Sequence, residues 1–210
     1  MKIFRREPAV KVLGPGKRAV IWVQGCKKNC PGCIAFENRD FSGGQQIELP
    51  ELRDWLLSLD DIEGITFSGG EPMEQAEEIA LLIDSIKSVK DLNILCYTGY
   101  TLEELIDLSS ESCNRLLKRV DILIDGPYLQ NLHADLLWRA SSNQRLIALS
   151  DMFKKFIEQL NPETDRSAGL EVSIGNDGSL KFSGVPHRPD FRNSFEKGLR
   201  ERGIILRDAE

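Results

Sequence analysis

The feature that most constrains the fold is a repeated alternation of short apolar segments with segments of helical periodicity along the first 150 residues. Residues 19–24, 64–68, 93–97 and 120–124 are short, apolar and rich in β-branched side chains, which is typical of buried strands. Residues 145–149 are a candidate fifth strand. Because helical segments separate the strands, the pattern predicts a parallel sheet with right-handed crossovers.

Start signals support the intervening helices. Pro50 precedes apolar residues at helical spacing, and Pro72 opens a second, longer helical segment, since proline suits the first turn of a helix. Thr101, followed three residues later by Glu104, forms a capping box that predicts a third helix start.

Four or five strand–helix units are too few for a closed eight-stranded barrel. We therefore predict an α/β fold in which residues 1–150 form an open, partial (β/α) barrel with a parallel sheet. Functional residues are expected at the carboxyl ends of its strands.

Residues 151–210 have a different pattern. Residues 151–160 and 191–202 are predicted helices, and residues 170–174 and 180–182 flank Asn176-Asp177-Gly178, a strong hairpin signal. We interpret this region as a small C-terminal α+β appendage to a single core domain.

Charge and hydropathy exclude several classes of protein. The formal net charge of −6 argues against a protein that mainly neutralises nucleic-acid phosphates. The charged first six residues lack the apolar stretch of a signal peptide, and no apolar run has the length of a membrane span. We expect a cytoplasmic protein without nucleic-acid or membrane partners.

Three of the five cysteines, Cys26, Cys30 and Cys33, fall within eight residues after the first predicted strand. This clustering is unlike a secreted disulfide framework and indicates a metal site. Three thiolates on so short a loop can ligate three irons of a [4Fe–4S] cube and leave the fourth iron open to an external ligand. Cys96 lies inside an apolar strand segment and Cys113 lies beside a helix end, and both are interpreted as core residues, while the isolated His133 and His187 receive no role.

Gly69, Gly70, Glu71 and Pro72 follow the second strand. Glycines at a strand end let a ligand approach backbone carbonyls, which can accept hydrogen bonds from an ammonium group. A carboxylate such as Glu71 adds charge-assisted acceptance at the same place. Taken alone, the segment is also compatible with a plain strand-to-helix turn.

The cysteine spacing and the Gly-Gly-Glu-Pro segment together resemble the radical S-adenosylmethionine (SAM) superfamily. The resemblance implies an oxidoreductase whose cluster reduces SAM, giving methionine and a 5′-deoxyadenosyl radical that abstracts hydrogen. It also implies a [4Fe–4S] cluster and SAM as cofactors.

Other segments resemble the activating enzymes of anaerobic ribonucleoside-triphosphate reductases, a subgroup of glycyl-radical activases. They are Cys30-Pro31-Gly32-Cys33, Tyr97-Thr98-Gly99-Tyr100, Asp125-Gly126-Pro127-Tyr128 and Ser141-Ser142-Asn143-Gln144-Arg145. By this resemblance Thr98 and Gly99 line the SAM pocket and Asp125 faces the active site. Ser142, Asn143, Gln144 and Arg145 would hold SAM or shape the mouth of its pocket.

The resemblance favours a protein substrate, a glycyl-radical enzyme, with a flavodoxin or ferredoxin as electron donor. A core of about 150 residues also leaves little wall for a deep small-molecule pocket. Two other functions stay open: a radical SAM enzyme that modifies a peptide or metabolite directly, and a zinc-binding interaction module. Cys30 and Cys33 could alternatively form a thioredoxin-like dithiol, although neither zinc nor a dithiol explains residues 69–72.

Overall fold

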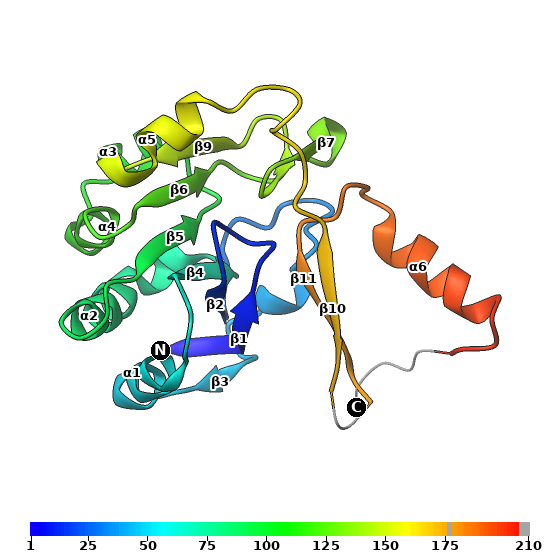
Figure 1. The fold of residues 1–210 in the computed structure, drawn as a ribbon, viewed down its shortest axis with the longest axis horizontal. Helices are drawn as coiled ribbons and strands as arrows, with labels where there is room; N and C mark the ends of the chain where they lie inside the picture. The colour runs from blue at the N-terminus through cyan, green and yellow to red at the C-terminus, as the bar shows by residue number, and fades with distance from the viewer. Residues whose placement is uncertain (176–177, 206–210) are drawn as a thin grey trace.

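The computed structural model describes residues 1–175 and 178–205, and its centre is a seven-stranded sheet (Figure 1). The strands lie in the order β3-β1-β2-β4-β5-β6-β9. Their bounds are β1 Lys2–Val10, β2 Arg18–Val23, β3 Gln45–Gln46, β4 Gly64–Gly69, β5 Asn93–Tyr97, β6 Ile122–Asp125 and β9 Arg145–Ala148. The α/β class is confirmed, with each predicted strand within a few residues of its expected place.

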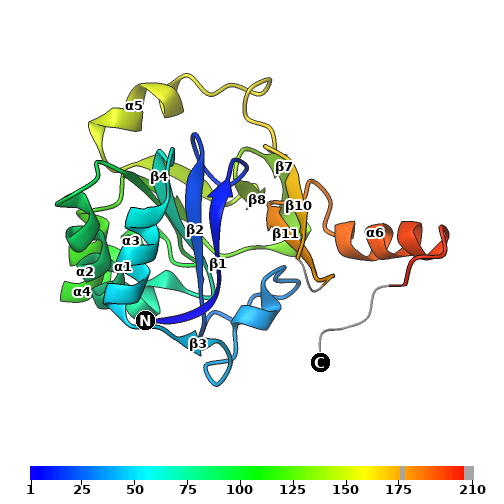
Figure 2. The same cartoon turned by 60° about the horizontal axis from the view of Figure 1, so that its bottom comes forward.

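Four α-helices lie along one face of the sheet (Figure 2). They are α1 Leu49–Ser58, α2 Ala76–Lys87, α3 Leu102–Asp107 and α4 Glu111–Leu117. Pro72 begins a 3₁₀ turn, η2 Pro72–Gln75, that runs directly into α2, and the capping box of Thr101 and Glu104 is present at the start of α3. The helix start signals in the sequence are therefore confirmed.

The side chains of strand β2 point alternately to the two faces of the sheet and contribute to a hydrophobic cluster on each. Ala19, Ile21 and Val23 pack against the helices, whereas Val20 and Trp22 belong to a separate cluster on the opposite face. Successive side chains of a strand point to opposite faces, so a strand that is apolar throughout must be covered on both sides.

The sheet is mixed rather than wholly parallel. Strands β2, β4, β5 and β6 are parallel, as predicted, but β1 pairs antiparallel with β2, and β9 pairs antiparallel with β6. Between β6 and β9 the chain forms only η3 Gln130–Leu132 and the hairpin of β7 His133–Leu136 and β8 Arg139–Ser141. Because no crossover helix carries the chain back to the other end of the sheet, β9 starts at the end where β6 finished and runs antiparallel to β6.

The elements after residue 150 are α5 Asp151–Glu158, β10 Leu170–Ile174, β11 Leu180–Gly184 and α6 Phe191–Arg200. Strands β10 and β11 pair as a separate two-stranded sheet, as the hairpin signal predicts. Asn176 and Asp177 of that signal lie outside the described residues. The closure of the sheet into a partial barrel and the division at residue 150 stay predictions.

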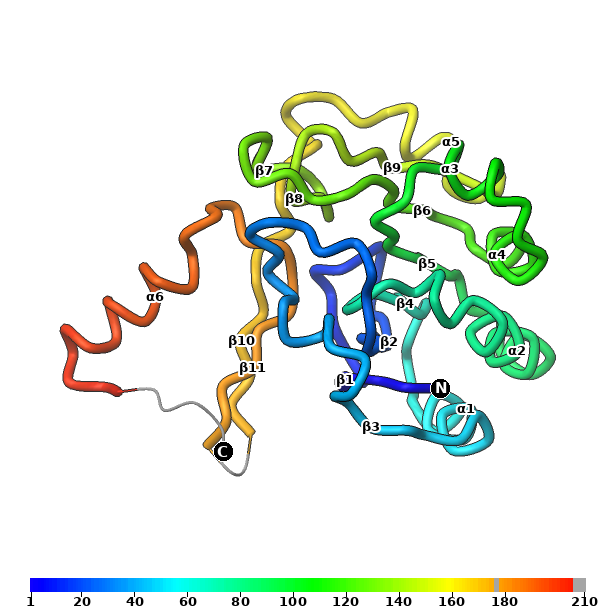
Figure 3. The backbone as a smooth tube through the Cα atoms, turned by 180° about the vertical axis from the view of Figure 1, so that it is seen from behind, coloured from blue at the N-terminus to red at the C-terminus, as the bar shows by residue number. Residues whose placement is uncertain are grey.

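The face of the sheet opposite α1–α4 is partly covered by chain that follows β7. Trp138, with Phe153 and Ile157 of α5, packs on β5 and β6, and Val185 packs against Val20 and Trp22 of β2. Figures 1 and 3 show the hairpin β10–β11 beside β1, with α6 projecting away from the sheet. Within residues 1–175 and 178–205, no helix has the length and hydropathy needed to cross a membrane.

Candidate active site

The cysteine loop, residues 26–33, leaves the carboxyl end of β2 and is shaped by a tight turn. The Cys33 N–H donates to the Cys30 carbonyl at 3.3 Å, and Gly32 between them has a φ of 71°. Proline followed by a glycine of positive φ is the central pair of a type II turn. The Pro-Gly pair therefore places Cys30 and Cys33 at the two ends of one turn.

The segment after the cysteines holds the base of the loop. The Asn38 carbonyl accepts from the Gly25 N–H at 2.8 Å, and the Arg39 carbonyl accepts from the Cys26 N–H at 3.0 Å. The Gln24 side chain also donates to the Glu37 and Asp40 carbonyls. These hydrogen bonds fix the position where the loop begins, and none of them involves a cysteine thiol.

All three loop cysteines are partly exposed and free of disulfides, whereas Cys96 and Cys113 are buried, as expected of core residues. Burial raises the pKa of the Cys26 and Cys33 thiols above the ordinary value. Metal coordination requires the thiolate, so binding would release these protons.

Among the described residues, no three Cys, His, Asp or Glu side chains converge as ligands of one metal ion. A [4Fe–4S] cube does not need such convergence, because each thiolate binds a different iron at a different corner. Three soft, half-buried donors on one loop fit such a cluster, and residues 1–175 and 178–205 contain no closed four-ligand site of the kind that the zinc hypothesis requires.

Gly69 and Gly70 allow the end of β4 to press against the end of β2. A Cβ atom at Gly70 would lie 2.3 Å from the Gly25 carbonyl oxygen, and one at Gly69 would lie 2.7 Å from the backbone of Val23. Gly69 also has a φ of 99°. Glycine is required at both positions because the preceding strand end comes so close.

Glu71 lies where the ends of β2, β4 and β5 meet. Its N–H donates to the Gly25 carbonyl at 2.8 Å. Its carboxylate accepts from the Met73 N–H at 3.0 Å, the Thr98 hydroxyl at 2.8 Å and the Gly99 N–H at 2.8 Å. Burial raises the pKa of this carboxyl, although the hydrogen bonds act in the opposite direction. The loop after β4 is thereby tied to the loop after β5.

Lys28 is a residue that sequence analysis missed. Its ammonium lies 3.6 Å from the centroid of the Tyr100 ring and 3.5 Å from Glu104. A cation over an aromatic face is attracted by the ring quadrupole, so this contact fastens the cysteine loop to the loop after β5. The chain carries no local signal for it, since the partners are about seventy residues apart.

Two of the site residues predicted after the fourth strand, Asp125 and Arg145, form a separate hydrogen-bond network where the end of β6 meets the start of β9. Asp125 is fully buried and accepts from the Leu102 N–H at 2.8 Å and from Arg145 Nε at 3.0 Å. Arg145 also contacts Glu103. The carboxylate of Asp125 is thus already engaged by protein groups.

Asn143 and Gln144 shape the turn after β6. The Asn143 amide donates to the Pro127 carbonyl at 2.7 Å, and the Gln144 amide donates to the Gly126 carbonyl at 3.2 Å. Ser142 is exposed, with its N–H donating to the Leu132 carbonyl. The structure therefore brings residues 26–33, 69–72 and 98–99 together, and it gives residues 125 and 143–145 structural hydrogen bonds beside them.

Comparison with known proteins assigns the class of protein that this fold and site define. A family model described as a 4Fe-4S single cluster domain matches residues 12–147. An anaerobic ribonucleoside-triphosphate reductase-activating protein of Enterobacteria phage T4 is 35% identical over 156 residues, covering 72% of this chain and 96% of the relative. One from Vibrio cholerae is 36% identical over 155 residues, covering 69% of this chain and 96% of the relative.

A pyruvate formate-lyase-activating enzyme of Clostridium pasteurianum is 30% identical over 116 residues, covering 53% of this chain and 45% of the relative. The chain belongs to the radical SAM activating enzymes that carry a single 4Fe-4S cluster domain. It is therefore an oxidoreductase that uses a [4Fe–4S] cluster and SAM.

Proposed function

We propose that Cys26, Cys30 and Cys33 ligate three irons of the cluster and that SAM binds beside them, at the carboxyl ends of β4 and β5. The observation that carries this assignment is the meeting of the cysteine loop with residues 69–71 and 98–99 through the contacts of Gly70 and Glu71. The cluster, when reduced, supplies the electron that cleaves SAM.

The chain's own residues would hold SAM in place. Backbone carbonyls of Gly69 and Gly70 would accept from the SAM ammonium, with Glu71, Pro72, Thr98 and Gly99 shaping that wall. Asp125, Ser142, Asn143, Gln144 and Arg145 would form the far side of the mouth, where most of them already brace the turn after β6.

We further propose that the protein partner is an anaerobic ribonucleoside-triphosphate reductase, on which this chain generates a glycyl radical. The named activity of the phage and Vibrio relatives supports this choice, since this chain spans 96% of each of them. A flavodoxin or ferredoxin is the proposed electron donor.

Anaerobic reconstitution tests the ligand assignment. Cys30→Ala should lose bound iron and sulfide together with SAM cleavage, whereas Cys113→Ala, at the buried cysteine of α4, should keep both. Cleavage at the normal rate by the Cys30 variant would refute the assignment.

Electron paramagnetic resonance tests the partner. The reduced holoenzyme, mixed with SAM and the anaerobic ribonucleotide reductase of the same organism, should give a glycyl radical signal on the reductase. A new product mass on an added peptide, with no radical on the reductase, would instead identify an enzyme that modifies its substrate directly.

A further inference from the structure

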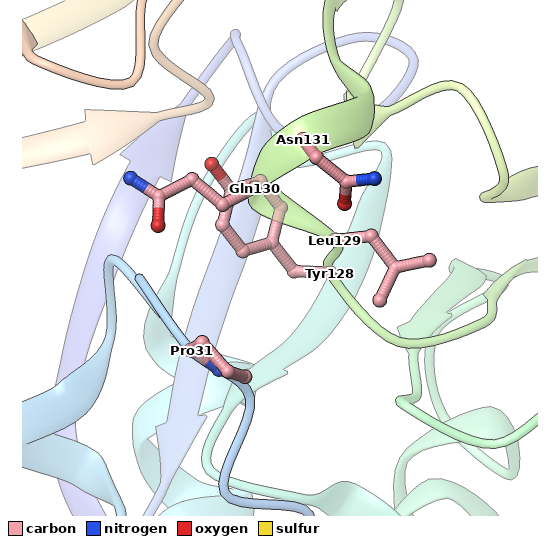
Figure 4. A pocket seen from close by; sticks show the side chains of 5 residues that line it. All are labelled: Pro31, Tyr128, Leu129, Gln130 and Asn131. Carbon is pink, nitrogen blue, oxygen red and sulfur yellow. The ribbon is translucent and has the colours of Figure 1, made fainter.

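An open pocket lies between the cysteine loop and the segment that follows β6 (Figure 4). It has a volume of about 430 Å³ and is lined by Pro31, Tyr128, Leu129, Gln130 and Asn131. None of these side chains carries a charge. The volume is within the ordinary range of ligand sites, and the missing charge argues against an anionic or cationic ligand.

Gln130 and Asn131 form the polar rim of this pocket. Both side chains are exposed, and in the part of the chain that the structure describes neither amide has a hydrogen-bond partner. Gln130 also lies against the cysteine loop, because a Cβ atom at Gly32 would lie 2.7 Å from its Oε1 atom. The amide of Gln130 thus lies beside the turn between Cys30 and Cys33, and the amide of Asn131 lies on the same pocket.

Tyr128 forms the aromatic wall and is held by His133. The Tyr128 hydroxyl lies 3.2 Å from His133 Nδ1, and the two rings meet edge to face with centroids 5.9 Å apart. Leu129 adds an apolar surface, with 37% of the residue exposed. A fixed ring costs little conformational entropy when a ligand packs on it.

These features match the backbone of an uncharged peptide. A primary amide offers both donors and an acceptor, which complement the C=O and N–H groups of a peptide unit. A glycine-containing segment brings its backbone closest to such a surface because it has no Cβ atom. A second pocket, lined in part by Cys26 and Asn29 of the loop, also includes the charged residues Arg39 and Asp40 and suits a neutral backbone less well.

We propose that the pocket between Pro31 and Tyr128–Asn131 binds the backbone of the glycine-bearing segment of the protein partner, with Gln130 and Asn131 as its hydrogen-bonding groups. This inference rests on the proposed function. It assigns partner recognition to the chain after β6, where it faces Pro31 of the cysteine loop.

The test compares two double variants of the holoenzyme in glycyl radical formation on the anaerobic ribonucleotide reductase, with rates expressed per bound cluster. Gln130→Ala with Asn131→Ala should raise the half-saturating concentration of reductase about tenfold or more, as two lost hydrogen bonds would. Gln45→Ala with Gln46→Ala removes two adjacent exposed amides from β3, at the far edge of the sheet, and should leave it unchanged.

Equal half-saturation for the wild type and the Gln130/Asn131 double variant would overturn the inference. If the alanine variant does not retain its cluster, Gln130→Glu with Asn131→Asp replaces it, since the shape is kept and the amide donors are lost. An unchanged half-saturating concentration would again overturn the proposal. Absence of any glycyl radical with the wild type would refute the proposed function itself, and this inference with it.

Discussion

The Glu71 side chain is buried to 1% exposure, and its carboxylate accepts three hydrogen bonds from groups on two loops. Burying a carboxylate is costly unless its oxygens are hydrogen-bonded, and here Oε1 accepts twice and Oε2 once. Glu71 is therefore well suited to position Thr98 and Gly99, in addition to any contact with SAM.

Glu71→Gln should weaken SAM binding about tenfold while the bound iron is retained. An amide nitrogen in place of Oε2 would face the Gly99 N–H, so that two donors oppose each other and one hydrogen bond is lost. Calorimetric titration of the anaerobic holoenzyme with SAM measures the effect. The matched control is Glu78→Gln on α2, and equal affinities of the two variants would contradict the positioning role.

Arg18 is a second buried charged residue, and it lies at the opposite end of the sheet. Its guanidinium is fully buried and donates to Thr66, Asn93 and the carbonyls of Pro15 and Ile65. Burial lowers the pKa of Arg18 to about 10. The Arg18 side chain thus supplies hydrogen-bond donors to acceptors on β4, on β5 and in the loop before β2.

Arg18→Ala should lower the free energy of unfolding by about 3–5 kcal/mol, because it leaves a cavity and several buried acceptors without a donor. Chemical denaturation followed by circular dichroism measures this loss. Arg53→Ala, at a partly exposed arginine of α1, should cost far less. Similar losses of unfolding free energy in the two variants would show that the hydrogen bonds of buried Arg18 contribute little to stability.

At the scale of elements, the join between β6, β9 and α3 depends on one arginine. Asp125 ends β6, Arg145 begins β9 directly opposite, and Glu103 lies in the first turn of α3. Hydrogen bonds from Arg145 lower the pKa of Glu103 from 4.5 to about 2. Removing Arg145 would return that carboxyl toward its ordinary pKa.

Arg145→Ala should therefore destabilise the protein in a pH-dependent way. A lowered folded-state pKa contributes stability that is fully present above the unfolded pKa of 4.5 and is lost as the pH falls through about 2. The difference in stability between the wild type and the variant should shrink over that window in urea unfolding measured at several pH values. A constant difference would mean that Glu103 contributes nothing.

At the scale of the whole molecule, the hairpin β10–β11 is fastened to the sheet through Arg5. The Arg5 guanidinium lies 3.8 Å from the centroid of the Trp22 ring and donates to the Phe182 carbonyl. On the hairpin, Phe182 packs against Phe191 and Phe195 of α6. One arginine thus connects β1, β2 and the C-terminal elements.

Arg5→Ala should lower hydrogen-exchange protection of the β10 and β11 amides about tenfold, with little change in β4 and β5, since it removes both a cation–π contact and a hydrogen bond. Mass spectrometry of exchanged peptides measures the effect. The control Lys181→Ala loses only an ion pair with Glu7 at 3.5 Å, whose lysine side chain is 46% exposed. Equal protection in both variants would show that Arg5 does not secure the hairpin.

Much of this organisation was predictable from local patterns. Apolar β-branched runs located the parallel strands, and Pro72 and the Thr101–Glu104 pair located helix starts, because these signals act within a few residues. The antiparallel direction of β9 was not predictable from residues 145–149 alone, since strand direction depends on how the chain returns after β6.

The sequence by itself determined the α/β class, and the spacing of Cys26, Cys30 and Cys33 together with residues 69–72 predicted the kind of cofactor. Local propensity and ligand spacing are properties of short segments, so a linear pattern can carry them. Only the tertiary structure decided that Glu71 joins two loops, that Arg145 neutralises Asp125 and that Gln130 lies beside Gly32. These contacts join residues remote in sequence, and packing of the whole sheet selects them.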